Sequence, residues 1–332
     1  MLLRRAALES VVAQKQLQFI PSLFGRNFRT SQHCCLQGAT AEVGEGHKPV
    51  ALDYEFYEAP RSGGSHSANT DAVVLCHGLF GSKQNWRSLG KAISQKTGVK
   101  VYALDLRNHG TSPHVDSMSY LGMATDLGKF FKDHSIRNAT LIGHSMGGKA
   151  VQSFALSPTL PQDALSHLVS VDMSPARGPL SNEFAQYIEG MIEIEEAKCT
   201  SRHQADEILQ RYEQELGIRQ FLLTNLVRAP GANYWTFRIP VKLIKRHLDE
   251  IGDFPYDSEA IHGTRPVRTW SGRALFVKGA KSKYINRKNR PLCDAFFRNA
   301  RHVELDTGHW VQAEDPKSFI KELVNFIETS PS

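Results

Sequence analysis

Short apolar runs alternate with amphipathic segments along most of the chain. The runs in AVVLCHG, KVYALDL, ATLIGHS, HLVSVDMS and RALFVKG are typical of buried parallel strands, and HVELDTGH adds another near the carboxyl end. Segments with helical periodicity lie between them, near 117–134, from about 146, near 290 and near 314–328. Strands separated by helices of this length predict an α/β fold with a mostly parallel, doubly wound sheet.

One long segment breaks this alternation. Between Pro175 and about Pro266 the pattern changes to helices without strands, beginning with a helix capped at Ser181 or Asn182. The helical patterns that follow are TSRHQADEILQRYEQELG, IRQFLLTNLV and IPVKLIKRHLDEIGDF. Ligands of doubly wound sheets bind beyond the carboxyl ends of the strands, so residues 175–266 are predicted to form a helical lid over that edge.

The amino-terminal residues have a different character from the rest. Residues 1–30 are amphipathic at helical spacing and carry five basic residues against Glu9 alone, which predicts a mitochondrial transit peptide with a processing site in RNFRTS. Residues 31–50 are rich in glycine and polar residues and are predicted to be a linker. The globular domain is expected to span 51–330, starting with a strand in LDYEFYE.

Composition excludes several classes of protein. The chain has 332 residues, 41% apolar, and a formal charge of +6. Residues 1–30 contribute +4 of this charge, and the +2 that remains does not indicate a nucleic-acid partner. No window approaches 18 uninterrupted apolar residues, so no transmembrane segment is expected, and the five cysteines lack the paired spacing of disulfide or metal sites.

The stretch GHSMG contains the strongest candidate for a catalytic residue. Gly143, Ser145 and Gly147 fit the G-x-S-x-G pattern directly after an apolar strand and directly before a helical segment. In that context the turn is so tight that only small residues fit two positions before and after the serine. The alternative is a glycine-rich turn between strand and helix with a helix-capping serine. The flanking strand and helix favour Ser145 as a nucleophile.

A serine hydroxyl requires a base and a group that orients the base. His309 is the predicted base because HVELDTGHW reads as a strand that ends in a Gly-His turn before the last helix. His77 and His144 are expected to be packing or loop residues. The orienting acid is harder to identify, because AKSKYINRK after RALFVKG contains no Asp or Glu and places Ser282 or its neighbours there.

Asp172 in HLVSVDMSP is the favoured acid, because the end of the preceding strand is the next place from which a carboxylate can reach His309. Asp249 in the predicted lid is the alternative. Asp306 lies too close to His309 along the same loop to be aimed at it, and is expected to be structural. The oxyanion donors are predicted to be the backbone N–H groups of Met146 and of Leu79, or Phe80, in the His-Gly loop CHGLFGS.

Three further features have structural interpretations. Asp105 and Arg107 in DLRNHG are expected to fix a loop beside the site by ion pairing and hydrogen bonding. Lys149, one turn into the helix after the nucleophile, is expected to be a packing or surface residue. The basic run KSKYINRKNR is expected to be a solvated loop, with attraction of an anionic acyl-CoA as the functional alternative.

The ordered motifs resemble those of the α/β-hydrolase superfamily over about residues 51–328, through LCHGLFGS, LDLRNHGTSP, IGHSMGGKA, VDMSP and LDTGHW. HGLFGSKQNW, DLRNHGTSPH, GHSMGGKA, VDMSP and RQFLLTNL look like those of the abhydrolase domain-containing protein 11 group, which is similar to bacterial short-chain esterases and yeast ethanol acetyltransferases. The resemblance implies an α/β-hydrolase fold with a lid inserted after the sixth strand, and neither metal nor organic cofactor. Esterases and acetyltransferases of this kind commonly place their acid after the sixth strand, which supports Asp172.

The chain is therefore expected to be a mitochondrial serine esterase or thioesterase, in the matrix or associated with the inner membrane, that cleaves small to medium acyl esters. An alcohol O-acetyltransferase that uses acetyl-CoA and ethanol is one alternative, since both activities need the same three residues. A non-catalytic mitochondrial interaction protein is the other, although such proteins usually lack the nucleophile or the base. The acyl chain length and the oligomeric state do not follow from the sequence.

Overall fold

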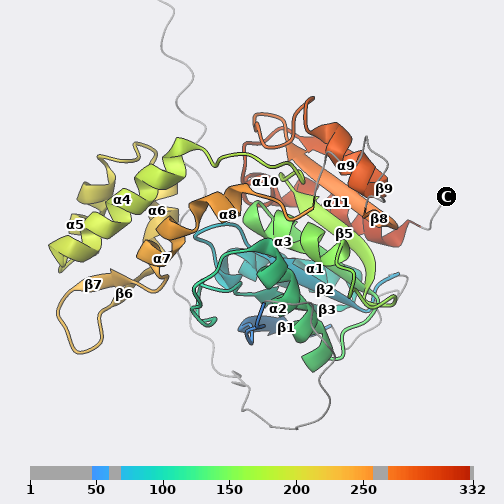
Figure 1. The fold of residues 1–332 in the computed structure, drawn as a ribbon, viewed down its shortest axis with the longest axis horizontal. Coiled ribbons are helices and arrows are strands. Elements are labelled where there is room, and N and C mark those ends of the chain that lie inside the picture. The colour runs from blue at the N-terminus through green and yellow to red at the C-terminus, as the bar shows by residue number, and fades with distance from the viewer. Residues whose placement is uncertain (1–46, 60–68, 257–267, 330–332) are drawn as a thin grey trace, which may run out of the picture. The chain divides into compact units, whose positions relative to one another are not determined.

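The computed structural model describes residues 47–59, 69–256 and 268–329, which all fall in one unit, Val43–Ser332 (Figure 1). The predicted transit peptide, most of the predicted linker and the carboxyl end of the predicted lid lie outside the described residues. None of the helices described is long and apolar enough to cross a membrane.

Seven strands form the main sheet, in the order β1-β3-β2-β4-β5-β8-β9. β1 is antiparallel to β3, and all other neighbours are parallel. The predicted mostly parallel sheet is confirmed. The strands are β1 (Tyr54–Tyr57), β2 (Ala72–Cys76), β3 (Lys100–Leu104), β4 (Ala139–His144), β5 (Leu165–Val171), β8 (Trp270–Gly279) and β9 (Phe297–Leu305).

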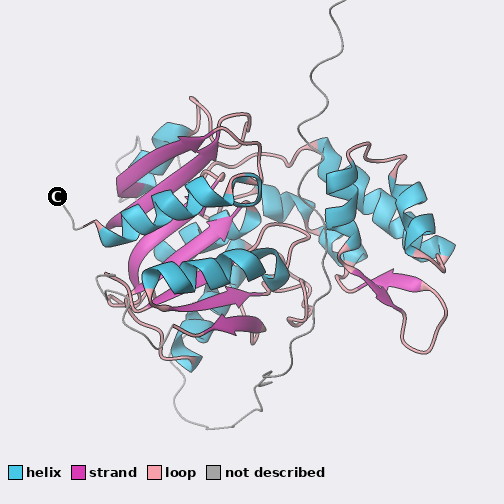
Figure 2. Ribbon diagram, turned by 180° about the vertical axis from the view of Figure 1, so that it is seen from behind, coloured by secondary structure: helices cyan, strands magenta, loops and turns pink. Residues whose placement is uncertain are grey.

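Helices cover both faces of this sheet (Figure 2). One face packs against α1 (Arg87–Thr97) and α11 (Pro316–Glu328), and the other against α2 (Tyr120–Asp133), α3 (Met146–Ala155) and α9 (Arg290–Phe296). Alternate residues of β2 therefore enter two different cores, Val73 and Leu75 one and Val74 and Cys76 the other. Burial on both faces explains why the strands are continuous apolar runs in the sequence. Two short helices, η1 (Lys83–Trp86) and α10 (Val311–Glu314), complete this part.

The described part of the inserted segment carries five helices and a small hairpin. Its helices are α4 (Asn182–Ala197), α5 (Arg202–Leu209), α6 (Leu216–Leu223), α7 (Val241–Arg246) and α8 (Leu248–Gly252). The prediction of helices without strands is wrong at one place, because β6 (Leu226–Arg228) and β7 (Trp235–Phe237) pair antiparallel. Between these two strands the chain reverses through Pro230 and Gly231, whose positive φ of 69° suits glycine.

The insertion also follows a different strand of the sheet from the one expected. Among the described residues, five strands of the main sheet precede it, so the insertion follows the fifth strand, β5, and not a sixth. The difference arises because only one strand, β1, precedes β2 in the part of the chain described. The insertion nevertheless leaves the sheet directly after VDMSP, at the carboxyl end of a central strand, as predicted.

Candidate functional site

Ser145 lies in a tight turn between β4 and α3. Its backbone has φ 54° and ψ −119°, a strained conformation for a residue other than glycine. A Cβ on Gly143 would lie 2.1 Å from the carbonyl oxygen of Gly147, and one on Gly147 would lie 2.5 Å from the carbonyl oxygen of His77. The two glycines are therefore required by close backbone approach, as the motif predicted.

The structure brings three of the predicted residues into one hydrogen-bonded line. Nε2 of His309 lies 3.0 Å from Oγ of Ser145, and Nδ1 of His309 lies 2.7 Å from Oδ2 of Asp172. The imidazole donates from Nδ1 to the carboxylate, so Nε2 is the nitrogen that accepts from the serine hydroxyl. His309 follows β9, Asp172 follows β5 and Ser145 follows β4, so the carboxyl ends of three strands supply the set.

Asp172 is completely buried, and its carboxylate is held by several donors. Oδ1 accepts from the backbone N–H of Gly279, 3.1 Å away at the end of β8. Oδ2 accepts from the hydroxyl of Ser282 as well as from His309. The loop after β8, where the sequence offers no Asp or Glu, thus contributes the hydroxyl of Ser282 as a donor to Asp172. In the sequence, only the serine at position 282 hinted at this contact.

The two other aspartates lie elsewhere. Asp249 is exposed on α8, and no hydrogen bond connects its carboxylate to His309 among the described residues. Asp306 is also exposed and forms an ion pair with Lys281, at 3.1 Å. Geometry therefore favours Asp172 over Asp249 as the partner of His309, and Asp306 has the structural position that was expected.

Neighbouring rings fix the orientation of His309. Tyr284 stacks on its imidazole with ring centroids 4.1 Å apart. Nε2 of His144 donates to the backbone carbonyl of His309, at 2.9 Å, and burial lowers the pKa of His144 to about 3, so this ring is neutral near pH 7. His144 is a packing residue as expected, and its contact holds the turn that carries His309.

The loop after β2 presents one free backbone donor to the site. The N–H of Phe80 donates to Nε2 of His109, 3.1 Å away, and is not available to a ligand. No described residue accepts from the N–H of Leu79 or of Met146. Of the two candidates in this loop, Leu79 is therefore the one whose N–H lacks an acceptor among the described residues. Asn225, which follows α6 in the insertion, donates from Nδ2 to the carbonyl of Phe80 at 2.7 Å.

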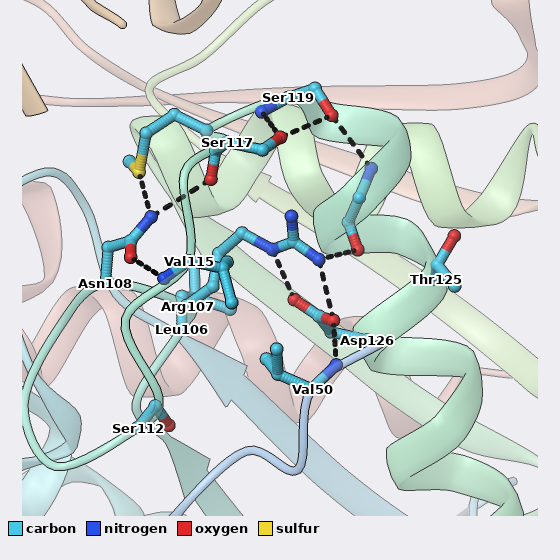
Figure 3. Close-up of polar contacts among 12 residues, drawn as sticks. Val50, Leu106, Arg107, Asn108, Ser112, Val115, Ser117, Ser119, Thr125 and Asp126 are labelled. Atoms are coloured by element: carbon cyan, nitrogen blue, oxygen red, sulfur yellow. Dashed lines mark hydrogen bonds and ion pairs between the residues drawn. The ribbon is translucent and has the colours of Figure 1, made fainter. Parts of the chain in front are cut away.

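A buried ion pair anchors the loop that carries His109 (Figure 3). Nε and Nη2 of Arg107 donate to the carboxylate of Asp126 at 2.6 and 2.9 Å, and Asp126 also accepts from the backbone N–H of Val50 (Figure 3). Asp105 pairs with Lys83 at 2.7 Å. Asp105 and Arg107 are thus structural, as predicted, and the partners Lys83 and Asp126 were not foreseen.

Two cavities meet at Ser145. One, of about 170 Å³, is lined by Ser145, Lys149, Arg177 and Tyr284 and is called the lysine cavity below. The other, of about 140 Å³, is lined by Ser145, Phe221, His309 and Trp310 and is called the aromatic cavity. Residues of the insertion line both cavities, including Leu180, Phe184, Ile218 and Ile251. The insertion therefore covers the site, which is the place predicted for a lid.

The remaining candidates have defined surroundings. Lys149 is buried and not on the surface, and its ammonium donates to the carbonyls of Gly252 and Asp253 at 2.7 and 2.8 Å. Cys76, Cys199 and Cys293 are free and buried. In the part of the chain that the structure describes, no group of three or more His, Cys, Asp or Glu side chains could hold a metal ion.

Comparisons with known proteins agree with this architecture. The family model described as alpha/beta hydrolase fold matches residues 71–316. The chain is 38% identical to "sn-1-specific diacylglycerol lipase ABHD11" of Xenopus tropicalis, over 90% of this chain and 88% of that protein. It is 33% identical to a "Probable alcohol acetyltransferase" of Saccharomyces cerevisiae, over 89% of this chain and 88% of that protein. Among solved structures, "Marine microorganism esterase" superimposes with a TM-score of 0.72 at 29% identity, covering 83% of this chain and 99% of that one.

Proposed function

Since the chain belongs to the α/β-hydrolase family and is a serine ester hydrolase, we propose that Ser145, His309 and Asp172 are its catalytic residues and that its substrates are small to medium acyl esters or thioesters. The observation that carries the proposal is the hydrogen-bonded line from Ser145 through His309 to Asp172, with N···O distances of 3.0 and 2.7 Å. A strained serine within hydrogen-bonding distance of an imidazole that is itself held by a carboxylate is the arrangement that nucleophilic catalysis requires.

In the first half of the reaction, Oγ of Ser145 attacks the acyl carbon while Nε2 of His309 takes the hydroxyl proton. The carboxylate of Asp172 stabilises the imidazolium that forms. The negative charge on the former carbonyl oxygen is stabilised by the N–H groups of Leu79 and Met146, which have no competing acceptor among the described residues.

In the second half, the imidazolium of His309 protonates the leaving oxygen or sulfur, and the bond between it and the acyl carbon breaks. Water then attacks the Ser145 ester and gives its proton to His309. The acid product leaves with a new C–O bond from water, and the serine recovers its proton.

Replacing Ser145 by alanine tests this mechanism. The Ser145→Ala variant is expected to lose hydrolysis of a short-chain nitrophenyl ester and labelling by a serine-reactive fluorophosphonate. Ser153→Ala is the matched control, since Ser153 lies on α3, which Ser145 precedes, is buried, and has a hydroxyl without a hydrogen-bond partner among the described residues. Labelling of the Ser145→Ala protein at the wild-type level contradicts the assignment.

Transfer of the acyl group to an alcohol is a second candidate activity, favoured by the 33% identity to the probable yeast alcohol acetyltransferase. The acyl-enzyme is the same, and an alcohol replaces water in the second half. Supplying acetyl-CoA and ethanol and measuring ethyl acetate against free acetate separates the two activities. Negligible ethyl acetate at saturating ethanol eliminates the transferase.

We also propose that the protein acts in mitochondria. The support is the basic, amphipathic composition of residues 1–30, which carry Glu9 as their only acid. A fluorescent protein fused to residues 1–30 is expected to enter mitochondria, and replacing Arg4 and Arg5 by glutamine is expected to reduce import. A cytosolic location of the unsubstituted fusion contradicts the proposal.

A further inference from the structure

The lysine cavity and the aromatic cavity differ in charge although both reach Ser145. Lys149, Arg177 and Lys283 line the lysine cavity, and none of the described residues that line it is Asp or Glu. The aromatic cavity has neither basic Lys or Arg nor acidic residues among its described lining, and its walls include Trp86, Phe221 and Trp310. A substrate that spans both cavities therefore meets positive charge on one side of Ser145 and aromatic rings on the other.

Lys149 contributes a buried charge with unused hydrogen-bonding capacity. Two of the three N–H groups of an ammonium are accounted for by the carbonyls of Gly252 and Asp253, which leaves one for a ligand in the cavity. Burial lowers the pKa of Lys149 to about 8, so the group is still mostly protonated at pH 7. Its charge has no carboxylate in hydrogen-bonding contact among the described residues.

Arg177, near the start of the inserted segment, adds a second group of N–H donors to the lysine cavity. Its Nε donates to the carbonyl of Phe254 at 2.7 Å and lies 3.3 Å from a carboxylate oxygen of Asp253. No described residue accepts from its two terminal nitrogens, which can bind a carboxylate in a bidentate manner. The carboxylate of Asp253 is itself more than half exposed, so it offsets only part of the positive charge.

The position of His309 decides which part of a substrate each cavity receives. His309 lines the aromatic cavity and is absent from the lining of the lysine cavity. Because the imidazolium must protonate the leaving group, the leaving group occupies the aromatic cavity. The acyl chain then extends into the lysine cavity, whose volume of about 170 Å³ exceeds the roughly 150 Å³ of an engineered cavity that holds benzene.

We propose that the preferred acyl group is a short chain that ends in a carboxylate, bound by Lys149 and Arg177, with an apolar leaving group in the aromatic cavity. The inference rests on the proposed function and keeps its chemistry. The ester bond to Ser145 forms as the bond to the leaving oxygen or sulfur breaks, and water later releases a dicarboxylic acid.

Three chromogenic or ultraviolet-detected esters test this substrate class. The monoester of glutaric acid with nitrophenol carries the anion on the acyl side, and nitrophenyl pentanoate has the same acyl length without the anion. The pentanoyl ester of hydroxybenzoate carries the anion on the leaving side. Wild-type protein is expected to show a kcat/KM for the glutarate ester at least about tenfold above that for the pentanoate, after subtraction of the rate with Ser145→Ala.

Two substitutions assign the preference to the lysine cavity. Lys149→Met is expected to reduce the ratio of the glutarate to the pentanoate kcat/KM about tenfold or more, mainly through KM for the glutarate ester. Arg177→Gln is expected to reduce the same ratio severalfold. It provides the test if Lys149→Met fails to fold, because the side chain of Arg177 is 46% exposed and its replacement disturbs packing less. Lys281→Gln is the control, since this exposed lysine is two positions from Lys283 of the cavity lining but is not part of that lining and pairs with Asp306.

The outcomes separate the two proposals. If the ratio of the glutarate to the pentanoate kcat/KM is near one in wild type, or is unchanged by Lys149→Met and Arg177→Gln, the proposal of an anionic acyl group is overturned. The proposed hydrolase activity is not affected by that result. A preference for the hydroxybenzoate ester that Lys149→Met removes places the anion on the leaving side and also overturns the inference. Absence of any hydrolysis that depends on Ser145 with all three esters contradicts the proposed function itself.

Discussion

The hydroxyl of Ser282 donates to Oδ2 of Asp172, the same carboxylate oxygen that accepts Nδ1–H of His309. Ser282 follows β8 and Asp172 follows β5, so the two loops from which a hydrolase of this fold could supply its acid meet at one carboxylate. In the proposed mechanism, the loop after β8 therefore positions the acid and does not provide it.

Removal of the Ser282 hydroxyl is expected to loosen Asp172 without removing it. Ser282→Ala should lower kcat roughly tenfold and leave KM nearly unchanged, because a hydrogen bond to a charged group contributes about 1.5–3 kcal/mol and substrate does not contact Ser282. Ser282→Thr keeps the hydroxyl and should restore most of the rate. Steady-state kinetics with a nitrophenyl ester measures both, and equal rates for the alanine and wild-type proteins contradict the positioning role.

Asparagine substitutions should distinguish the two candidate acids. Asp172→Asn is expected to reduce kcat by several orders of magnitude, on the scale of the roughly 10⁴-fold loss known for the corresponding change in serine proteases, because it favours the wrong tautomer of the histidine. Asp249→Asn is expected to stay within about twofold of wild type, since Asp249 is an exposed residue of α8. The reverse order of activities moves the acid into the insertion.

Asn225 links the insertion, through the carbonyl of Phe80, to the loop after β2 that carries Leu79, a proposed oxyanion donor. Asn225→Ala should lower kcat roughly tenfold, less than the 100-fold to 1000-fold typical when an oxyanion donor is itself removed. Asn233→Ala, which alters an exposed residue between β6 and β7, is the matched control and should retain full turnover. If the two substitutions lower kcat equally, the effect is a general one on the insertion and not a specific one on the loop after β2.

Gly143 is expected to tolerate no side chain. In Gly143→Ala the new Cβ meets backbone atoms of Gly147 and Gly148 at 2.1–2.7 Å, and neither can move without distorting the turn at Ser145. We expect a loss of at least about 3 kcal/mol in the free energy of unfolding, or failure to fold. Gly128→Ala on α2 is the control: its nearest contact is 3.7 Å and its helix propensity improves, so thermal unfolding should show wild-type stability or better.

Stability should depend on pH through buried histidines. Burial lowers the pKa of His109 to about 3, from about 6.5 in the unfolded chain, so the unfolded state binds the proton more readily. This contribution to stability is complete above about pH 6.5 and is lost as the pH falls toward 3. His109→Gln should reduce the slope of unfolding free energy against pH in this window by up to about 1.4 kcal/mol per pH unit.

Urea unfolding between pH 4 and 7 measures that slope. His203→Gln changes an exposed histidine of α5 and should leave the slope as in wild type. A slope that His109→Gln leaves unchanged contradicts a neutral buried imidazole at this position.

Local patterns in the sequence were sufficient to predict the sheet and to select Ser145 and His309, whose side chains the structure places within hydrogen-bonding distance. The strands are buried on both faces and therefore read as apolar runs, and the turn at Ser145 is so close to Gly147 that its glycines are visible as a motif. His309 could be placed because the order of strands and turns along the chain is that of the fold. These features depend on neighbours in the chain, which is why they could be read without a structure.

Contacts between distant segments were decided only by tertiary structure. Ser282 reaches Asp172 across 110 positions, Asn225 reaches Phe80 across 145, and Lys149 reaches Gly252 across 103. Leu79 and not Phe80 keeps an N–H without an acceptor, because a ring nitrogen of His109 accepts from the N–H of Phe80 across 29 positions. No local periodicity encodes such pairs, because each is formed by parallel strands and an insertion that bring together segments far apart in the sequence.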